Sequence, residues 1–192
     1  MGAGILPTTI HNNKLYFLFG KENQYEDSAP GFSDFGGGTD NNETFYETAL
    51  REACEEFTGF LGNKKDIQNL LKPGTYNIDY QAPNTTHKKY RMHIFFYPYN
   101  EYLPFYYNNN QRFLQTHLPA DIIKQTKIFE KAEIRWICVD DLKKMKSQFR
   151  SYFQNIIDII LLERNKIKQF IENIKNKKSR KRNKTIKKRH SF

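Results

Sequence analysis

Cysteine and long apolar runs are both scarce in this sequence, and their scarcity excludes several classes of protein. The 192 residues include two cysteines, Cys54 and Cys138, which are too few for the dense disulfide framework of a small secreted domain. The five histidines are scattered along the chain, which excludes a Cys/His zinc site. The most apolar segment, residues 156–162, is interrupted by Asp158, so no stretch reaches the ~20 apolar residues of a membrane span.

Targeting features are also lacking at the N-terminus. No basic segment followed by an apolar one is present, as a secretory signal peptide would require. Leu6 stands where a myristoylation motif has Ser or Thr. We therefore expect a soluble, cytoplasmic protein that does not bind membranes, with the nucleus as an alternative if the basic C-terminus is a targeting segment.

Positive charge is concentrated at the C-terminus. Residues 1–163 carry 18 Lys/Arg against 20 Asp/Glu, a net charge of −2, whereas residues 164–192 carry 13 against one, a net charge of +12. This split excludes a uniformly basic protein. Beyond Lys175 the apolar spacing stops, so residues 175–192 are expected to form a disordered basic tail. Residues 175–189 could hold RNA, or could bind polyanions without any sequence information.

Apolar spacing predicts alternating strands and helices in the rest of the chain. A mixed sheet with helices on its faces is the expected architecture. Residues 1–146 are expected to form one domain, followed by an amphipathic helix over 147–174 that packs on it. Residues 99–127 show no clear pattern and are interpreted as an insertion or long loop. Strands are expected near residues 3–6, 15–19, 32–35, 76–80, 90–97 and 134–139, with helices near 43–59 and 65–71 and a third after 140.

A cluster of carboxylates follows a glycine run, Gly36–Gly38, in the segment that carries the chemical signal. Glu52, Glu55 and Glu56 stand at i, i+3 and i+4, so a helix brings them to one face. Clustered anions repel one another unless a cation joins them, and ligands that are all oxygen suit Mg²⁺ or Mn²⁺ better than zinc. The alternative is a solvated acidic helix face, which is common.

The combined spacing of these residues resembles the signature of the Nudix hydrolases, G-x5-E-x7-R-E-U-x-E-E-x-G-U, where U is a bulky apolar residue. The sequence departs from this pattern at Ala53, which is small for U, and at Thr58, where the closing glycine is expected one residue before Gly59. Six residues are in register with the signature: Gly37, Glu43, Arg51, Glu52, Glu55 and Glu56.

The resemblance covers about residues 2–145 and implies a Nudix-type α/β/α sandwich around a mixed sheet. It also implies hydrolysis of a nucleoside diphosphate linked to another group, X. By resemblance, Glu52, Glu55 and Glu56 would bind one to three divalent cations, Mg²⁺ or Mn²⁺, with the Gly37 carbonyl as a further ligand.

Other roles follow from the same resemblance. Arg51 would orient a carboxylate and Glu43 would support the site, while Glu52 is a base or a ligand in different family members. A further acidic residue often precedes the family's tryptophan, which makes Glu133 the better candidate and Glu130 the weaker one. The alternative for both is a surface ion pair with Lys131 or Arg135.

Three functions remain open from the sequence. The first is a nucleotide diphosphatase, and the second is an mRNA-decapping enzyme that holds capped RNA with its basic tail. The third is a non-catalytic module that binds nucleotide or RNA, although all three glutamates are present. Substrate choice would depend on residues 20–35 and 81–127. Tyrosines in or next to these segments, such as Tyr80 and Tyr90, could stack on a base or simply pack in a core.

Overall fold

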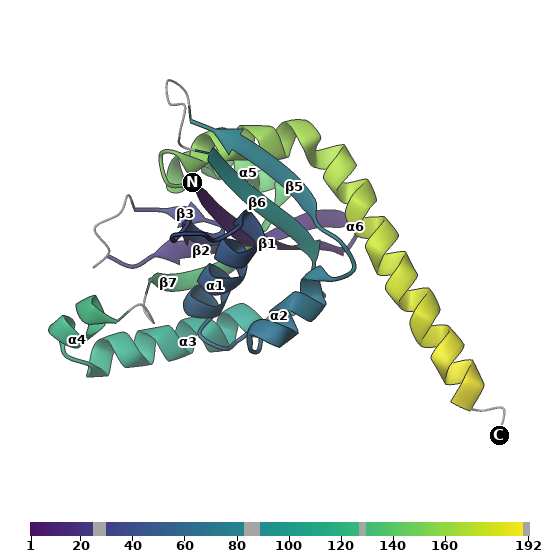
Figure 1. Ribbon diagram of the computed structural model, residues 1–192, viewed down its shortest axis with the longest axis horizontal. Coiled ribbons are helices and arrows are strands. Elements are labelled where there is room, and N and C mark those ends of the chain that lie inside the picture. The colour runs from purple at the N-terminus through teal and green to yellow at the C-terminus, as the bar shows by residue number, and fades with distance from the viewer. Residues whose placement is uncertain (25–29, 83–88, 127–129, 190–192) are drawn as a thin grey trace.

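The computed structural model describes the backbone of residues 1–24, 30–82, 89–126 and 130–189, and the side chains in these ranges as far as residue 179. The described residues form seven strands. Figure 1 shows the sheet with helices around it. The strands are β1 Gly2–His11, β2 Lys14–Glu22, β3 Phe32–Ser33, β4 Phe35–Gly38, β5 Tyr76–Gln81, β6 Lys89–Phe96 and β7 Lys131–Cys138. The helices are α1 Phe45–Phe57, α2 Lys64–Leu71, α3 Tyr102–His117, α4 Ala120–Gln125, α5 Val139–Met145, the 3₁₀ turn Lys146–Gln148 and α6 Phe153–Arg189.

The sheet is mixed, as predicted. Its strands run in the order β3-β2-β1-β6-β5, with β4 also paired to β1 and β7 to β2. Among these strand pairs, β1 and β6 are parallel, and the other five pairs are antiparallel. The first two expected strands form an antiparallel hairpin, and its turn residues Asn12 and Asn13 have φ of 47° and 61°. Asparagine tolerates this left-handed region, which a two-residue hairpin turn requires.

Helices cover both faces of the sheet, which confirms the expected α/β/α arrangement. Side chains alternate between the two faces along each strand, because successive residues of a strand point to opposite sides. In β1, Leu6 and Ile10 belong to the core beneath α5 and α6. Ala3 and Ile5 belong to a second core beneath α1, α2 and α3.

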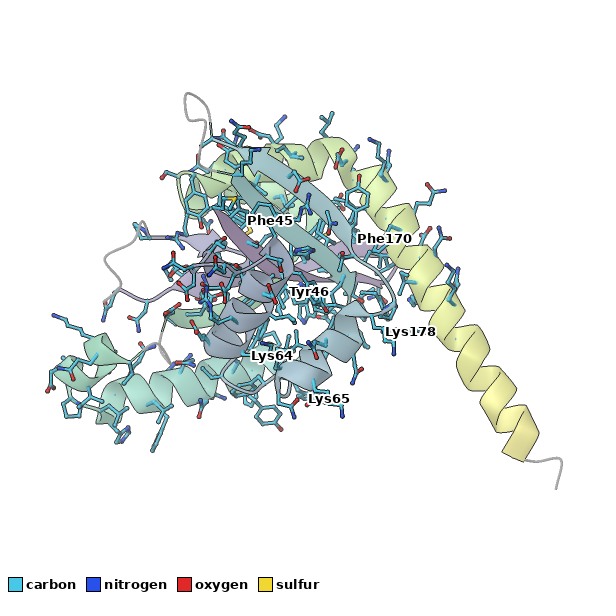
Figure 2. The ribbon with its side chains drawn as sticks, viewed as in Figure 1. Phe45, Tyr46, Lys64, Lys65, Phe170 and Lys178 are labelled. Atoms are coloured by element: carbon cyan, nitrogen blue, oxygen red, sulfur yellow. The ribbon has the colours of Figure 1, made fainter. Side chains whose placement is uncertain are left out.

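The last helix, α6, is longer than the sequence predicts. Its isoleucines at 156, 157, 160, 167, 171 and 174 are buried, whereas Leu162 is exposed. Farther along the helix, Phe170 packs near Tyr76 and Lys178 lies over the ring of Phe96 (Figure 2). The described backbone is helical as far as Arg189, and residues 190–192 lie outside the described chain. The expected disorder of residues 175–192 stays a prediction. Lys and Arg favour helix, and extending a nucleated helix costs little. None of the helices in the described ranges is long and apolar enough to cross a membrane.

Residues 99–127 were also expected to be a loop, and this prediction is wrong for most of them. They contain α3 and α4. The Asn100 side chain accepts a hydrogen bond at 2.9 Å from the backbone N–H of Tyr102, the first residue of α3. The buried residues of α3, Leu103, Tyr107 and Gln111, form a narrow stripe that ends in a polar residue. Asn-rich sequence and such a narrow stripe give little helical signal.

Candidate active site

The start of α1 is fixed by a capping box. The Thr44 hydroxyl accepts a hydrogen bond from the Glu47 N–H at 3.2 Å, and the Glu47 carboxylate accepts one from the Thr44 N–H at 2.9 Å. This reciprocal cap satisfies two backbone donors that the first turn would leave unpaired. It also fixes where the helix begins, and hence which residues of α1 face the glycine strand β4.

Arg51 joins several of the residues that match the signature spacing into one network. Its Nε donates to Glu43 Oε1 at 2.9 Å, its Nη1 donates to Glu52 Oε1 at 2.8 Å, and its Nη2 donates to the Gly38 carbonyl at 2.8 Å. Nη1 also lies 3.5 Å from Glu55 Oε2. The planar guanidinium therefore links α1 to β4 and offsets the charge of the carboxylates around it.

Glu43 is held in its charged form. Its carboxylate accepts hydrogen bonds from Arg51, from the Asp40 N–H at 3.2 Å and from the Thr48 hydroxyl at 3.0 Å. These donors, Arg51 foremost, lower the pKa of Glu43 to about 2. The sequence-based expectation that Glu43 and Arg51 share one charge network is consistent with these contacts.

A side chain at position 37 would collide with the carboxylate of Glu52. A Cβ there would lie 2.5 Å from Glu52 Oε1, closer than non-bonded atoms approach. Gly37 therefore lets β4 pass directly over the carboxylate. This close approach gives a physical reason for the glycine that begins the signature spacing.

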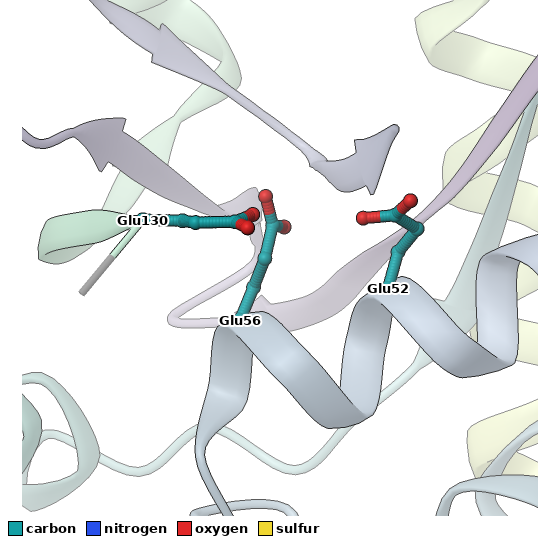
Figure 3. A group of neighbouring side chains, drawn as sticks. All are labelled: Glu52, Glu56 and Glu130. Atoms are coloured by element: carbon teal, nitrogen blue, oxygen red, sulfur yellow. The ribbon is translucent and has the colours of Figure 1, made fainter. Parts of the chain in front are cut away.

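Three carboxylates converge beside this glycine. Glu52 and Glu56 from α1 and Glu130, just before β7, each offer an oxygen within 4.8 Å of the others (Figure 3). Glu130 is tied in through its backbone, whose carbonyl accepts a hydrogen bond from the Asn23 N–H at 2.9 Å. Glu55 is not part of this group and lies near Arg51 instead.

Glu133, the preferred sequence candidate, also lies outside the group. Its Oε1 accepts hydrogen bonds from Arg135 Nε at 3.0 Å and Nη2 at 2.5 Å. This is the surface ion pair considered as its alternative role. The geometry therefore favours Glu130 over Glu133, the reverse of the order expected from the sequence.

The donor set fits a divalent cation. Glu56 is buried and its Oε2 has no hydrogen-bond partner, which is costly unless a cation binds there. Burial raises the pKa of Glu56 well above its usual range, and the neighbouring carboxylates of Glu22 and Glu52 add to the rise. Oxygen-only ligands of this kind suit Mg²⁺ or Mn²⁺, and Glu52, Glu56 and Glu130 are the residues that would hold it.

A buried lysine lies against this cluster. Lys131 is fully buried, and its Nζ is 3.0 Å from Glu56 Oε1 and 3.1 Å from the Ser33 hydroxyl. It also forms an ion pair with Glu22, which binds Arg150 Nη1 at 2.7 Å. Burial lowers the pKa of Lys131, but the two carboxylates outweigh it and raise the pKa overall. Sequence reasoning missed this group, because a lysine beside a glutamate reads as a surface ion pair.

The closing residue of the signature spacing adopts a glycine-like conformation. α1 ends at Phe57, and Thr58 follows with φ 48° and ψ 37°, in the left-handed region. Gly59 has φ 88°. The turn therefore occurs at the position where the family pattern has glycine, and a threonine occupies it at a cost of about 1–2 kcal/mol.

The chain is similar to several solved structures at low sequence identity. A Nudix hydrolase from M. smegmatis is 14% identical, with 82% of this chain and 84% of that chain covered, at a TM-score of 0.46. A MutT protein from Methanosarcina mazei is 16% identical over 85% of this chain and 93% of that chain, at a TM-score of 0.45. A bifunctional NMN adenylyltransferase/ADP ribose pyrophosphatase from Francisella tularensis is 15% identical over 84% of this chain and 41% of that chain, at a TM-score of 0.48.

No protein-family model matches the sequence, and no curated protein matches it. The functional argument therefore rests on the residues of this chain and on their geometry.

Proposed function

We propose that the protein is a Nudix-type hydrolase that uses Mg²⁺ or Mn²⁺ to cleave a pyrophosphate bond in a nucleoside diphosphate linked to a group X. The single observation that carries this proposal is the convergence of Glu52, Glu56 and Glu130 next to Gly37, with Arg51 bonded to both Glu43 and Glu52. A solvated acidic helix face would explain neither the buried Glu56 oxygen nor the close approach of β4.

Each residue has a separable role in the proposed reaction. Glu52, Glu56 and Glu130 would hold a divalent cation, which would supply positive charge against the pyrophosphate oxygens. Arg51 keeps Glu52 oriented through Nη1, and Glu43 anchors the guanidinium. Glu52 and Glu130 are the candidates to accept a proton from the attacking water, because Lys131 occupies one oxygen of Glu56.

Glutamine substitutions test the proposal. Glu52→Gln, Glu56→Gln and Glu130→Gln keep side-chain size but remove a ligand charge, so each should abolish turnover of every pyrophosphate substrate. Each should also weaken Mn²⁺ binding measured by calorimetry. Glu133→Gln is the matched control, since Glu133 binds Arg135, and it should retain both properties. Full activity of the Glu56 and Glu130 variants with saturating Mg²⁺ would overturn the assignment.

The Glu55→Gln variant tests the remaining signature carboxylate. By resemblance Glu55 is a metal ligand, but it lies outside the group of Glu52, Glu56 and Glu130, and its Oε2 is 3.5 Å from Arg51 Nη1. Glu55→Gln should therefore reduce turnover less than Glu56→Gln does.

Decapping of mRNA is the second candidate, and the extent of α6 favours it. The helix continues to Arg189, beyond its last buried residue, Ile174. The segment from residue 175 to 189 contains ten Lys/Arg and no Asp/Glu. A basic helix that extends from the domain could hold the phosphates of an RNA body through counterion release.

Truncation after Ser179 separates the two candidates. It removes seven Lys/Arg but keeps Lys175, bonded to the Ile10 carbonyl at 3.2 Å, and Lys178, which lies over Phe96. For a decapping enzyme, KM for capped RNA should rise and its salt dependence should flatten, while kcat stays near its starting value. Hydrolysis of small nucleotides should not change. Nucleotide or RNA binding with no turnover in Mg²⁺ or Mn²⁺ would instead support the non-catalytic module.

A further inference from the structure

A cavity of about 410 Å³ lies beside the candidate metal site. The backbone of Gly36–Gly38 forms one of its walls, and Gly37 lies directly against the Glu52 carboxylate. We propose that Arg150, on another wall of this cavity, binds a phosphate group of the substrate. The inference deepens the proposed function, because it assigns a substrate-binding residue outside the signature spacing.

The charge of this cavity suits an anion. Its described lining contains two cationic side chains, Lys89 and Arg150, and no carboxylate. The adjoining cluster has the opposite charge, since Glu52 and Glu56 converge there with Glu130. A phosphate chain therefore needs a metal ion where it meets the carboxylates and finds cations of the protein where it enters the cavity. An arginine matches phosphate oxygens especially well, because its N–H donors lie in one plane.

Tyrosine rings lie next to these cations. Those in the described lining belong to Tyr80, Tyr90 and Tyr152. The Tyr90 hydroxyl donates a hydrogen bond to Asp34 Oδ2 at 2.8 Å, which fixes the position of this ring. Bases stack on aromatic rings, so the cavity suits a phosphate that carries a nucleoside.

The Arg150 side chain is oriented before any ligand arrives. Its Nη1 donates a hydrogen bond to Glu22 Oε1 at 2.7 Å, and its guanidinium carbon lies 4.9 Å from the centre of the Tyr152 ring. Its Nε has no hydrogen-bond partner, so the protein does not use all five N–H donors of this arginine. A side chain that is already held in place loses less entropy when it binds a ligand.

The backbone at Arg150 is fixed against β3. Phe149 pairs with Phe32 in a parallel bridge, and the Arg150 N–H donates to the Phe32 carbonyl at 3.1 Å. Gly31 has φ 122°, and a Cβ there would lie 2.8 Å from the Arg150 nitrogen, so glycine permits this close approach. The buried ring of Phe149 packs edge-on against Phe19, with ring centres 4.9 Å apart. The core therefore places Arg150 at the cavity, although it follows the segment that resembles the Nudix hydrolases.

The alternative is that Arg150 only stabilises buried charge. Glu22 pairs with both Arg150 and Lys131, and Lys131 also pairs with Glu56. Without Arg150, Glu22 would still have Lys131 as its partner. A purely structural role therefore predicts a lower melting temperature and no effect that depends on the phosphate of a ligand. A phosphate-binding role predicts a loss of affinity that is confined to phosphorylated ligands.

Equilibrium binding without metal tests the proposal on the full-length protein. After dialysis against EDTA, the protein is titrated by calorimetry with AMP, CMP, GMP and UMP, and with the four corresponding nucleosides. At least one monophosphate should bind ten or more times as tightly as its nucleoside, the worth of a charge-assisted hydrogen bond. Equal affinities within every pair, or no binding of any monophosphate, would overturn the proposal.

Variants assign the phosphate to Arg150. Arg150→Gln should abolish the preference for the monophosphate and leave the affinity for the nucleoside unchanged. Arg150→Lys keeps the charge beside Glu22 but lacks the planar fork, so it should retain part of the preference, and it carries the test if the glutamine variant does not fold. An equal loss of nucleoside and monophosphate affinity in both variants would show a structural role only and overturn the proposal.

Two further variants serve as controls. Arg135→Gln is the matched control, because Arg135 also pairs with a glutamate, Glu133, but lies outside the described lining of the cavity. It should retain the full preference for the monophosphate. Lys89→Gln should reduce the preference less than Arg150→Gln does, since Lys89 is exposed. Loss of the preference in Lys89→Gln but not in Arg150→Gln would assign the phosphate to the lysine and overturn the proposal.

Kinetics with Mg²⁺ separate this inference from the proposed function. ATP, ADP-ribose and diadenosine tetraphosphate are assayed with wild type and Arg150→Gln. For each substrate that wild type cleaves, kcat/KM should fall about tenfold in the variant, mostly through a rise in KM. If none is cleaved, the proposed hydrolase fails for these substrates, and the binding measurements still decide the role of Arg150. Normal turnover by wild type, without a preference for any monophosphate, would overturn this inference alone.

Discussion

Lys131 Nζ lies 3.0 Å from Oε1 of Glu56, in a fully buried ion pair at the candidate metal site. The other oxygen of Glu56 has no hydrogen-bond partner. The lysine therefore occupies Oε1 and leaves Oε2 without a hydrogen-bond partner, in a carboxylate that lies close to those of Glu52 and Glu130. A lysine in this position compensates permanently for part of the negative charge of the cluster.

Removing this lysine should be strongly destabilising. Lys131→Met leaves Glu22 and Glu56 buried without their shared cation, which should cost about 3–5 kcal/mol of unfolding free energy. Adding Glu22→Gln to Lys131→Met removes one of the two buried carboxylate charges, and it should restore part of the lost unfolding free energy. Urea unfolding of the two single variants and the double variant measures the coupling. Additive effects would show that the pair does not interact.

Arg51→Lys should lower both stability and turnover. Lysine cannot reach Glu43, Glu52 and the Gly38 carbonyl together, because it lacks the planar fork of arginine. Arg91→Lys provides a matched control, since Arg91 also makes a two-pronged pair, with Asp79 at 2.6 and 2.8 Å, but on an exposed strand surface. That change should alter stability by less than about 1 kcal/mol. Melting temperature and kcat are measured for both, and normal kinetics for Arg51→Lys would count against the hydrolase.

Thr58→Gly should stabilise the protein by about 1 kcal/mol. The substitution relieves the left-handed backbone at φ 48° and removes a buried hydroxyl that has no hydrogen-bond partner. Thr116→Gly, in the last turn of α3, should have the opposite sign, since glycine is a poor helix former. Thermal unfolding compares the two. Destabilisation by Thr58→Gly would mean that the left-handed turn carries no strain.

Asp34 should make stability depend on pH. Burial raises its pKa in the folded state to about 7, from the ordinary value of 3.8. Folding therefore takes up a proton, and this contribution to stability falls as pH rises from about 4 to about 7 and is lost above pH 7. Asp34→Asn keeps an acceptor for the Tyr90 hydroxyl and removes the charge. The difference in unfolding free energy between Asp34→Asn and wild type should shift in favour of the variant by roughly 2–4 kcal/mol from pH 4 to pH 8. Urea unfolding across this range should show the gain, and parallel curves would contradict it.

The sequence was most informative within α1, where function depends on local spacing. Positions 43, 51, 52 and 56 lie on one helix and its approach, so helical geometry alone predicts that Arg51 is near Glu43 and that Glu52 and Glu56 share a face. The pairing of Gly37 with Glu52 is a contact between two elements, and it entered only through the family resemblance.

The ranking of Glu130 and Glu133 depended on a feature that the sequence does not display. The pairing of β2 with β7 shifts register between Lys21 and Glu22, where Lys21 faces Glu133 and Glu22 faces Lys131. Such a bulge changes the direction in which the side chains on either side of it point. Simple alternation along β7 therefore does not indicate which acidic residue turns toward α1.

The cluster of Lys131, Glu22 and Arg150 could not be predicted from the sequence, for a different reason. Its members come from three distant parts of the chain, and Glu22 and Arg150 are 128 positions apart. Each is an ordinary charged residue by composition. Tertiary packing buries these side chains, and their spacing along the chain does not indicate that burial.

The packing of α6 on β1 determines when one face of the first strand can be covered during synthesis. Ile10 and Lys175, joined by a 3.2 Å hydrogen bond, are 165 residues apart. At translation rates of about 5–20 residues per second, the face of the first strand that carries Leu6 and Ile10 stays uncovered for on the order of ten seconds. The nascent chain therefore exposes an apolar sheet face to chaperones and to other nascent chains until its last helix is made.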